Sequence, residues 1–185
     1  EQAFTANELR TSVGMEGVSL RRNAPSLLNV AFVQRLFHDG RAGSLEEQAV
    51  MPIIHPDEMA NPSLASVVSR LSAWPEYRAL FRRAFGPGWP TARRMATALA
   101  AYQRTLLAAD SPFDRWRYGG HADAITPQQQ RGFELFVTQG CASCHAVGAN
   151  HALFTDHDFH NVGVQLRSEA LRQRVLQHQL VDAIA

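Results

Sequence analysis

The sequence lacks lysine entirely, because all 18 of its basic side chains are arginines. Against 17 acidic side chains they leave a formal net charge of +1, which gives no basis for binding nucleic acid or an anionic membrane. Long apolar runs are also missing, since none approaches the roughly 18–20 residues of a membrane span. No secretory signal peptide is recognisable, so we expect a mature or cut chain.

Cysteine is scarce as well, and both cysteines lie in one short motif. Two residues lie between Cys141 and Cys144, and His145 follows Cys144 directly. This spacing is the attachment signature of a c-type haem, in which each thiol forms a thioether and the histidine binds the iron. A structural zinc site would need further ligands, and a thioredoxin-like pair would need a βαβ context. Because haem c is attached outside the cytoplasm, we expect a periplasmic protein.

The periodic segments predict an all-α fold. Strand-like alternation is scarce, and Ala, Leu, Arg and Gln dominate the stretches with helical spacing. The longest helix is predicted over residues 91–109, with Met95, Leu99, Tyr102 and Leu106 facing the core. Other helix starts are predicted at Asn61-Pro62, where Asn61 is the cap, at Pro75, at Thr126-Pro127 and at Ser168.

The chain is predicted to contain two domains, residues 1–111 and 112–185. Residues 110–124 hold proline and adjacent glycines with few periodic apolar side chains, as in a connection between two units. Residues 21–62 are less regular and hold polar side chains in the setting where functional sites tend to lie. Neither end reads as a finished structure, so we expect a fragment with parts missing on both sides.

Several motifs, in a fixed order, resemble one protein family. Residues 22–32 read RNAPSLLNVAF, residues 37–42 FHDGRA, residues 45–49 LEEQA and residues 111–114 SPFD. Together with Glu58-Met59 and the haem motif, they resemble the bacterial di-haem cytochrome c peroxidases and their MauG-type relatives over residues 11–163.

The resemblance implies two helical, cytochrome c-like haem domains, both incomplete in this chain. The first haem would be peroxidatic, with its attachment motif upstream of Glu1. The second would pass electrons to it and would be held by Cys141, Cys144 and His145. Two haem c groups are therefore expected, although the sequence contains one attachment motif. The corresponding motifs after the second haem would lie beyond Ala185.

The resemblance also assigns Gln48 and Glu58 to the open face of the peroxidatic haem. A carboxylate can move the proton of a bound peroxide, and an amide can orient it. Glu58 lies ten positions after Gln48, with Pro52 between them, so a loop over the haem is more consistent than one helix face. From the residues alone, Glu58 also fits a solvated acid beside a helix start, and Glu46 and Glu47 are the rival acids.

Three further positions carry implications of the resemblance. Asn23 matches a residue that binds calcium between the haem domains, although it also fits a turn cap before Pro25. Met15 stands where many relatives have a removable histidine ligand, and we interpret it as an apolar loop residue rather than an iron ligand. His38 stands where the family usually has a tryptophan relay, which puts that relay in doubt.

Three functions follow as hypotheses. The first is a periplasmic enzyme that reduces hydrogen peroxide to water with electrons from a small cytochrome c or a cupredoxin. The second is a MauG-type enzyme that oxidises side chains of a partner protein, which Met15 favours. The third is a non-catalytic c-type electron carrier, which a distal pair such as Gln48 and Glu58 argues against. The resemblance also allows a homodimer.

Overall fold

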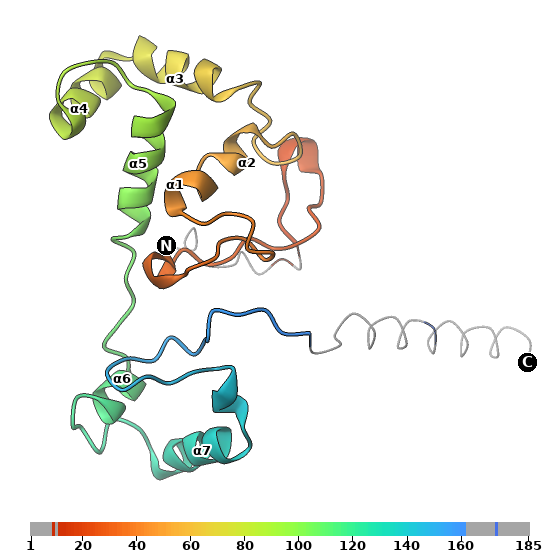
Figure 1. Ribbon diagram of the computed structural model, residues 1–185, viewed down its shortest axis with the longest axis vertical. Helices are drawn as coiled ribbons and strands as arrows, with labels where there is room; N and C mark the ends of the chain where they lie inside the picture. Colours follow the sequence, from red (N-terminus) through yellow and green to blue (C-terminus); the bar gives the residue numbers. More distant parts are fainter. Residues whose placement is uncertain (1–8, 10, 162–172, 174–185) are drawn as a thin grey trace, which may run out of the picture. The chain divides into compact units, whose positions relative to one another are not determined.

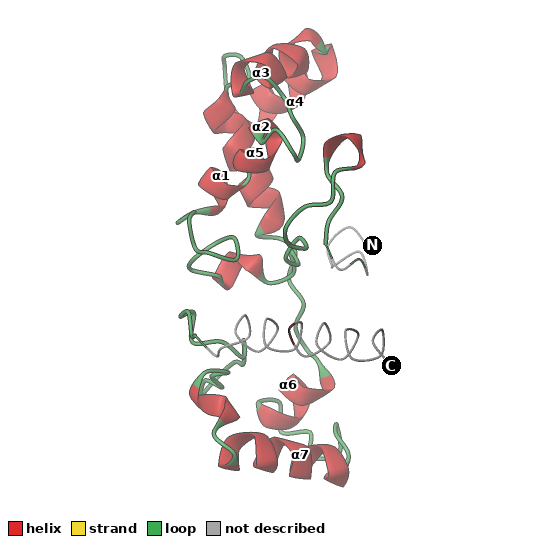
Figure 2. Ribbon diagram, turned by 90° about the vertical axis from the view of Figure 1, so that its right-hand side faces the viewer, coloured by secondary structure: helices red, strands yellow, loops and turns green. Residues whose placement is uncertain are grey.

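Every regular element of the described chain is helical. The computed structural model describes residues 9, 11–161 and 173, and Figure 2 shows helices and loops but no strand among them. Backbone pairing of the β type is limited, within these residues, to the bridges Val13–Ser19 and Leu36–Ala42. The predicted all-α class is therefore confirmed. None of the described helices is long and apolar enough to cross a membrane.

The helices are joined by loops (Figure 1). The elements are η2 (Met15–Gly17), η3 (Val30–Phe32), α1 (Leu45–Gln48), α2 (Met51–Ile54), α3 (Leu64–Ala73), α4 (Pro75–Phe85), α5 (Ala92–Gln103), α6 (Pro112–Arg117), α7 (Pro127–Thr138) and η4 (Cys141–Ser143). The chain divides into two compact units, Glu1–Glu134 and Leu135–Ala185. The predicted domain boundary after residue 111 stays a prediction, and the helix predicted at Ser168 lies outside the described residues.

The start of α3 differs from the prediction. Ser63, not Asn61, is its cap, and the Ser63 hydroxyl accepts a hydrogen bond from the Ser66 amide at 3.1 Å. The Asn61 side chain is engaged elsewhere, because its amide nitrogen donates to the Ile53 carbonyl at 2.8 Å and its oxygen accepts from Arg70. The Asn61 side chain, which the sequence pattern predicted as the cap, therefore makes tertiary hydrogen bonds instead. By contrast, Pro75 begins α4 as predicted.

The long helix predicted over residues 91–109 ends at Gln103. Met95 is buried as expected, but Leu99 and Tyr102 are 38% and 53% exposed. The chain leaves the helix because the next segment is bound by Asn29, whose main-chain amide donates to the Leu106 carbonyl at 2.8 Å. A long-range contact thus overrides local helix propensity.

Asn29 ties the first irregular segment to the end of α5. Its side-chain nitrogen donates to the Ala108 carbonyl at 2.8 Å, and its side-chain oxygen accepts from the Ala108 amide at 2.9 Å. The residue has a φ of 59°, in the left-handed region that asparagine tolerates better than most side chains.

We expect Asn29→Ala to lower the free energy of unfolding by about 2–3 kcal/mol, because two hydrogen bonds are lost and alanine is strained at this φ. Asn29→Asp keeps one acceptor and the tolerance for positive φ, so a smaller loss is expected. Urea unfolding of the two variants provides the measurement. Equal losses, or no loss in either variant, would contradict this role.

The first unit has two small apolar clusters. One joins α1 to α5 through Val30, Leu36, Ala42, Leu45 and Ala100. Ala100 has no exposed surface, and its small side chain lets α1 approach α5 closely. The other cluster joins α2, α4 and α5 through Ile53, Phe81 and Met95. These clusters hold α1, which carries Gln48, and α2, which precedes Glu58, against the longer helices.

Aromatic rings hold α6 against the start of α7. Phe113 lies 5.2 Å from Phe133 between ring centroids, edge to face, and Trp116 lies 5.5 Å from the same ring. Ser111 caps α6 with a capping box to Asp114. Thr126 caps α7 as predicted, since its hydroxyl accepts from the amide of Gln129, three residues further on. Aromatic pairs in this arrangement stabilise the packing of α6 on α7 beyond the effect of the area that they bury.

Candidate functional site

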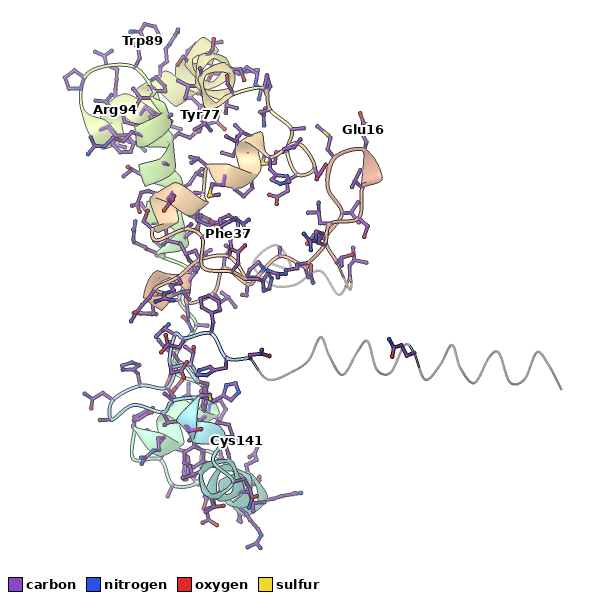
Figure 3. The ribbon with its side chains drawn as sticks, turned by 45° about the vertical axis from the view of Figure 1, so that its right-hand side comes forward. Glu16, Phe37, Tyr77, Trp89, Arg94 and Cys141 are labelled. Atoms are coloured by element: carbon purple, nitrogen blue, oxygen red, sulfur yellow. The ribbon has the colours of Figure 1, made fainter. Side chains whose placement is uncertain are left out.

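The cysteine–histidine motif lies on a single tight turn at the end of α7. Gly140 has a φ of 79°, a left-handed conformation that glycine adopts without strain and that ends the helix. The chain then enters η4, where the Cys144 and His145 amides both donate to the Cys141 carbonyl, at 3.3 and 3.0 Å. This turn gathers both thiols and the imidazole on one short loop (Cys141 is labelled in Figure 3).

The His145 imidazole is oriented by a main-chain carbonyl. Its Nδ1 lies 3.0 Å from the Phe154 carbonyl oxygen, and because a carbonyl only accepts, Nδ1 is the nitrogen that donates. The lone pair of Nε2 is then left for a metal, the arrangement typical of a ligating histidine. Phe136 supports the ring, with centroids 6.1 Å apart, and packs edge to face on Phe154.

These side chains fit a covalently bound haem. Cys141 and Cys144 are free thiols, exposed and half-buried respectively, so both are accessible for thioether formation. His145 presents one nitrogen as an iron ligand while the other is held by the backbone. The structure thus places all three predicted haem-binding groups on one turn, and their binding of haem stays a prediction.

A second polar pair lies beside the motif. His160 Nε2 and Asp156 Oδ2 are 2.8 Å apart, and ligand atoms of both lie within 4.8 Å of the Cys144 sulfur. The Asp158 amide and His160 together lower the pKa of the Asp156 carboxyl. Three such groups can bind a metal, but Cys144 belongs to the haem motif, so this cluster does not form a separate site.

Gln48 and Glu58 lie on consecutive elements of the first unit. Gln48 is the last residue of α1, and Glu58 lies in the turn after α2, where its amide donates to the His55 carbonyl at 3.1 Å. Both residues are half-buried. In the described part of the chain, neither side chain has a hydrogen-bond partner and the two are not bonded to each other. The structure therefore leaves both polar groups available for a ligand.

The rival acids have structural partners. The Glu47 carboxylate accepts from the Gly43 amide at 2.9 Å, which caps the start of α1. The Glu46 carboxylate receives two hydrogen bonds from the Arg104 guanidinium, at 2.7 and 2.9 Å, and so joins α1 to the end of α5. Both lie in the first turn of α1. Their engagement favours Glu58 as the acid that acts on a substrate.

The Glu46–Arg104 pair predicts a pH dependence. The Arg104 guanidinium lowers the pKa of the Glu46 carboxyl, so the pair stabilises the fold above the ordinary glutamate pKa. This contribution is lost as the pH falls through the lowered folded value. Because the side chains are 36% and 46% exposed, the effect is small.

We expect Glu46→Gln to lower the melting temperature by a few degrees at neutral pH and to have no effect in acid. Glu76→Gln, which changes an acid in the exposed first turn of α4, is the matched control. Melting curves across this pH range provide the measurement, and an equal response of the two variants would contradict the assignment.

Asn23 is at the centre of a polar network. Its side-chain oxygen accepts from the Ser12 hydroxyl at 2.8 Å and from the Ala24 amide at 3.0 Å, and its nitrogen donates to the Leu9 carbonyl at 2.9 Å. The His38 Nε2 lies 2.9 Å from the Asn23 carbonyl. The turn-capping interpretation is therefore realised here, and the calcium role of Asn23 stays a prediction.

Met15 begins η2, and its side chain is 45% exposed. Its amide, rather than its thioether, makes the contact that matters locally, because it donates to the Asp57 carbonyl at 3.0 Å. The interpretation of Met15 as an apolar loop residue rather than an iron ligand stays a prediction. Sequence reasoning did not find this contact, nor the Phe154 carbonyl beside His145, because main-chain partners carry no signal in the residue type.

An all-α chain with a C-x-x-C-H turn and an oriented histidine is a c-type haem protein. Residues 1–122 match the family model of the di-haem cytochrome c peroxidases. The chain belongs to this family. The predicted resemblance is confirmed, and membership implies haem c as cofactor and an oxidoreductase family.

Relatives of both types are similar to the chain. Methylamine utilization protein MauG of Methylorubrum extorquens is 47% identical over 159 residues, covering 85% of this chain and 43% of the relative. Cytochrome c551 peroxidase of Pseudomonas aeruginosa is 41% identical over 143 residues, covering 76% and 40%. The chain thus spans less than half the length of these relatives.

Solved structures of a di-haem peroxidase and of a MauG-like protein are also similar to the chain, which again spans less than half of each. The di-haem peroxidase BthA of Burkholderia thailandensis superimposes with a TM-score of 0.67 at 31% identity, covering 80% of this chain and 42% of that structure. A MauG-like protein associated with microbial copper homeostasis gives 0.67 at 26% identity, covering 83% and 46%. The helical architecture of the chain is therefore that of part of a di-haem peroxidase.

Proposed function

We propose that the chain is the part of a periplasmic di-haem peroxidase that supplies the distal residues of the peroxidatic haem and the attachment site of the electron-transfer haem. The observation that carries the proposal is the combination of an oriented haem-binding turn with a half-buried carboxylate, Glu58, that has no hydrogen-bond partner among the described residues. An electron carrier alone would need only the first of these features.

The overall reaction consumes one hydrogen peroxide, two electrons and two protons and releases two waters. Haem c, when bound, supplies the iron that holds the peroxide and carries the electrons. Glu58 takes the proton from the near oxygen of the peroxide and delivers it to the far oxygen, so that water leaves. Gln48 orients the peroxide by donating a hydrogen bond from its amide nitrogen. Cys141, Cys144 and His145 hold the second haem.

The electron donor is a small redox protein, either a cytochrome c or a cupredoxin, that delivers one electron at a time. Asn23 binds calcium in this proposal, by exchanging its present hydrogen bonds for an ion. A homodimer is the assembly that we propose for the complete protein.

A MauG-type activity is the second candidate. Met15 replaces the removable histidine ligand, and the MauG relative is the more similar of the two compared above, 47% against 41% identical. In this case the peroxide would oxidise side chains of a partner protein rather than a redox donor.

The test uses the full-length mature protein and measures peroxide consumption with reduced cytochrome c or cupredoxin as donor. The proposal expects donor oxidation in a ratio of two electrons per peroxide. Rapid peroxide consumption that requires a protein substrate and leaves the donor reduced would favour the MauG-type activity. Absence of any peroxide consumption would contradict both.

A further inference from the structure

The segment around Met15 packs against the turn that carries Glu58. Residues 12–20 form a tight hairpin, closed by hydrogen bonds from the Gly14 amide to the Val18 carbonyl and from the Leu20 amide to the Ser12 carbonyl, both 2.8 Å. Figure 1 shows this hairpin beside the loop that follows α2, and Glu16, labelled in Figure 3, lies at its tip. The contact is made by main-chain atoms, since the Met15 amide donates to the Asp57 carbonyl.

Gly14 is required by this close approach. A β-carbon at Gly14 would overlap the Asp57 carbonyl oxygen and would lie 3.0 Å from its carbonyl carbon. The φ of Gly14 is −97°, which any residue adopts, so backbone freedom is not the reason for a glycine here. The obstructing atoms are main-chain atoms, which cannot rotate away as a flexible side chain can. Any side chain at position 14 must therefore displace the turn.

The turn itself is closed on its other side by His55. The Asp57 amide donates to His55 Nδ1 at 3.2 Å, and the Glu58 and Ala60 amides donate to the His55 carbonyl at 3.1 and 2.9 Å. A displacement of the Asp57 carbonyl is consequently transmitted through one peptide unit to Glu58. The carboxylate of Glu58, which has no hydrogen bond of its own to the described residues, takes its position from this backbone.

We infer that Gly14 is a positioning residue for Glu58: the glycine admits the Asp57 carbonyl, and the Met15 amide holds it. This inference rests on the proposed function, in which Glu58 moves the peroxide proton. It assigns the hairpin a role that is independent of whether the Met15 sulfur ever binds iron.

The first test compares peroxide turnover of full-length Gly14→Ala with that of Gly43→Ala. A β-carbon at Gly43 would meet nothing within 4 Å, so this variant adds the same methyl group without obstruction. We expect kcat to fall by roughly 10–100-fold in Gly14→Ala, the effect of misplacing a reacting group by about 1 Å. KM for peroxide and the turnover of Gly43→Ala should not change. Unchanged kcat in Gly14→Ala would overturn the inference.

The double variant Gly14→Ala/Glu58→Gln separates positioning from general damage. If Gly14 acts through Glu58, the double variant turns over peroxide as slowly as Glu58→Gln alone. If the losses multiply, or if Gly14→Ala slows an enzyme that Glu58→Gln leaves intact, the inference is overturned while peroxidase activity stands. A wild-type protein that consumes no peroxide would overturn the proposed function and this role with it.

A second measurement needs no variant and no activity. Hydrogen exchange of the Met15 amide in the wild-type protein should be slow, because its proton is bonded to the Asp57 carbonyl. Exchange at the rate of an unstructured peptide would show that the hairpin does not hold the turn and would overturn the inference, even where Gly14→Ala fails to fold.

Discussion

Replacing Glu58 with glutamine is expected to lower peroxide turnover of the full-length protein by about 10²–10⁴-fold, the usual contribution of general acid–base catalysis. Glutamine keeps the size and polarity of the side chain but cannot accept and return a proton. The absorption spectrum of the haem bound at His145 should stay the same, because the change leaves its three binding side chains intact. Steady-state kinetics with a reduced donor and a spectrum of each preparation provide the measurement.

Glu76→Gln is the matched control for Glu58, because it removes one negative charge from the exposed first turn of α4. Its turnover should equal that of the wild-type protein. If Glu58→Gln retained wild-type turnover, Glu58 would have no place in the mechanism, and a loss of equal size in Glu76→Gln would point to a general effect of charge.

Removing both thiols has the second large effect. We expect Cys141→Ala/Cys144→Ala to lose one covalently bound haem per chain and all donor-driven peroxide turnover, since electrons enter through that haem in the proposed function. The intact mass of the purified protein measures the first outcome and donor oxidation the second. Haem content equal to that of the wild-type protein would contradict the assignment of the motif.

Ser143→Ala controls for disturbance of the turn. It removes the hydroxyl that donates to the Gly140 carbonyl at 2.6 Å and also lies 3.9 Å from the Cys144 sulfur, and it leaves both thiols in place. Haem content and turnover of this variant should match the wild-type values. If Ser143→Ala lost haem as well, folding of the loop rather than thioether chemistry would explain the double variant.

Local signals predicted the helices well where the capping groups had no competing partner. Pro75 begins α4 as expected, because proline has no amide that needs a partner at the first helical position. Thr126 caps α7 as expected, because its hydroxyl accepts from the Gln129 amide. The prediction that Asn61 caps α3 was wrong, because its side chain donates to the Ile53 carbonyl and accepts from Arg70. The predicted end of α5 was wrong for a similar reason, since Asn29 forms hydrogen bonds with the segment that follows this helix. Contacts between residues far apart in sequence decided both cases.

Within the candidate site, groups close together in sequence were likewise predictable and long-range partners were not. The haem-binding turn was predictable because its three reactive groups lie within five residues and their spacing follows from the chemistry. The partners that orient the site were not, because the Phe154 carbonyl and the Asp57 carbonyl are main-chain atoms and Arg104 is 58 residues from Glu46. The resemblance assigned Gln48 and Glu58, and their roles await the experiments above.

The most direct test of the account is the number of covalently bound haems in the complete mature protein, counted by mass spectrometry of the intact chain. We predict two haems, one at Cys141 and Cys144 and one at a separate motif that serves Gln48 and Glu58. A single haem would contradict it, because the distal residues would then have no peroxidatic haem to act on and the protein would be an electron carrier.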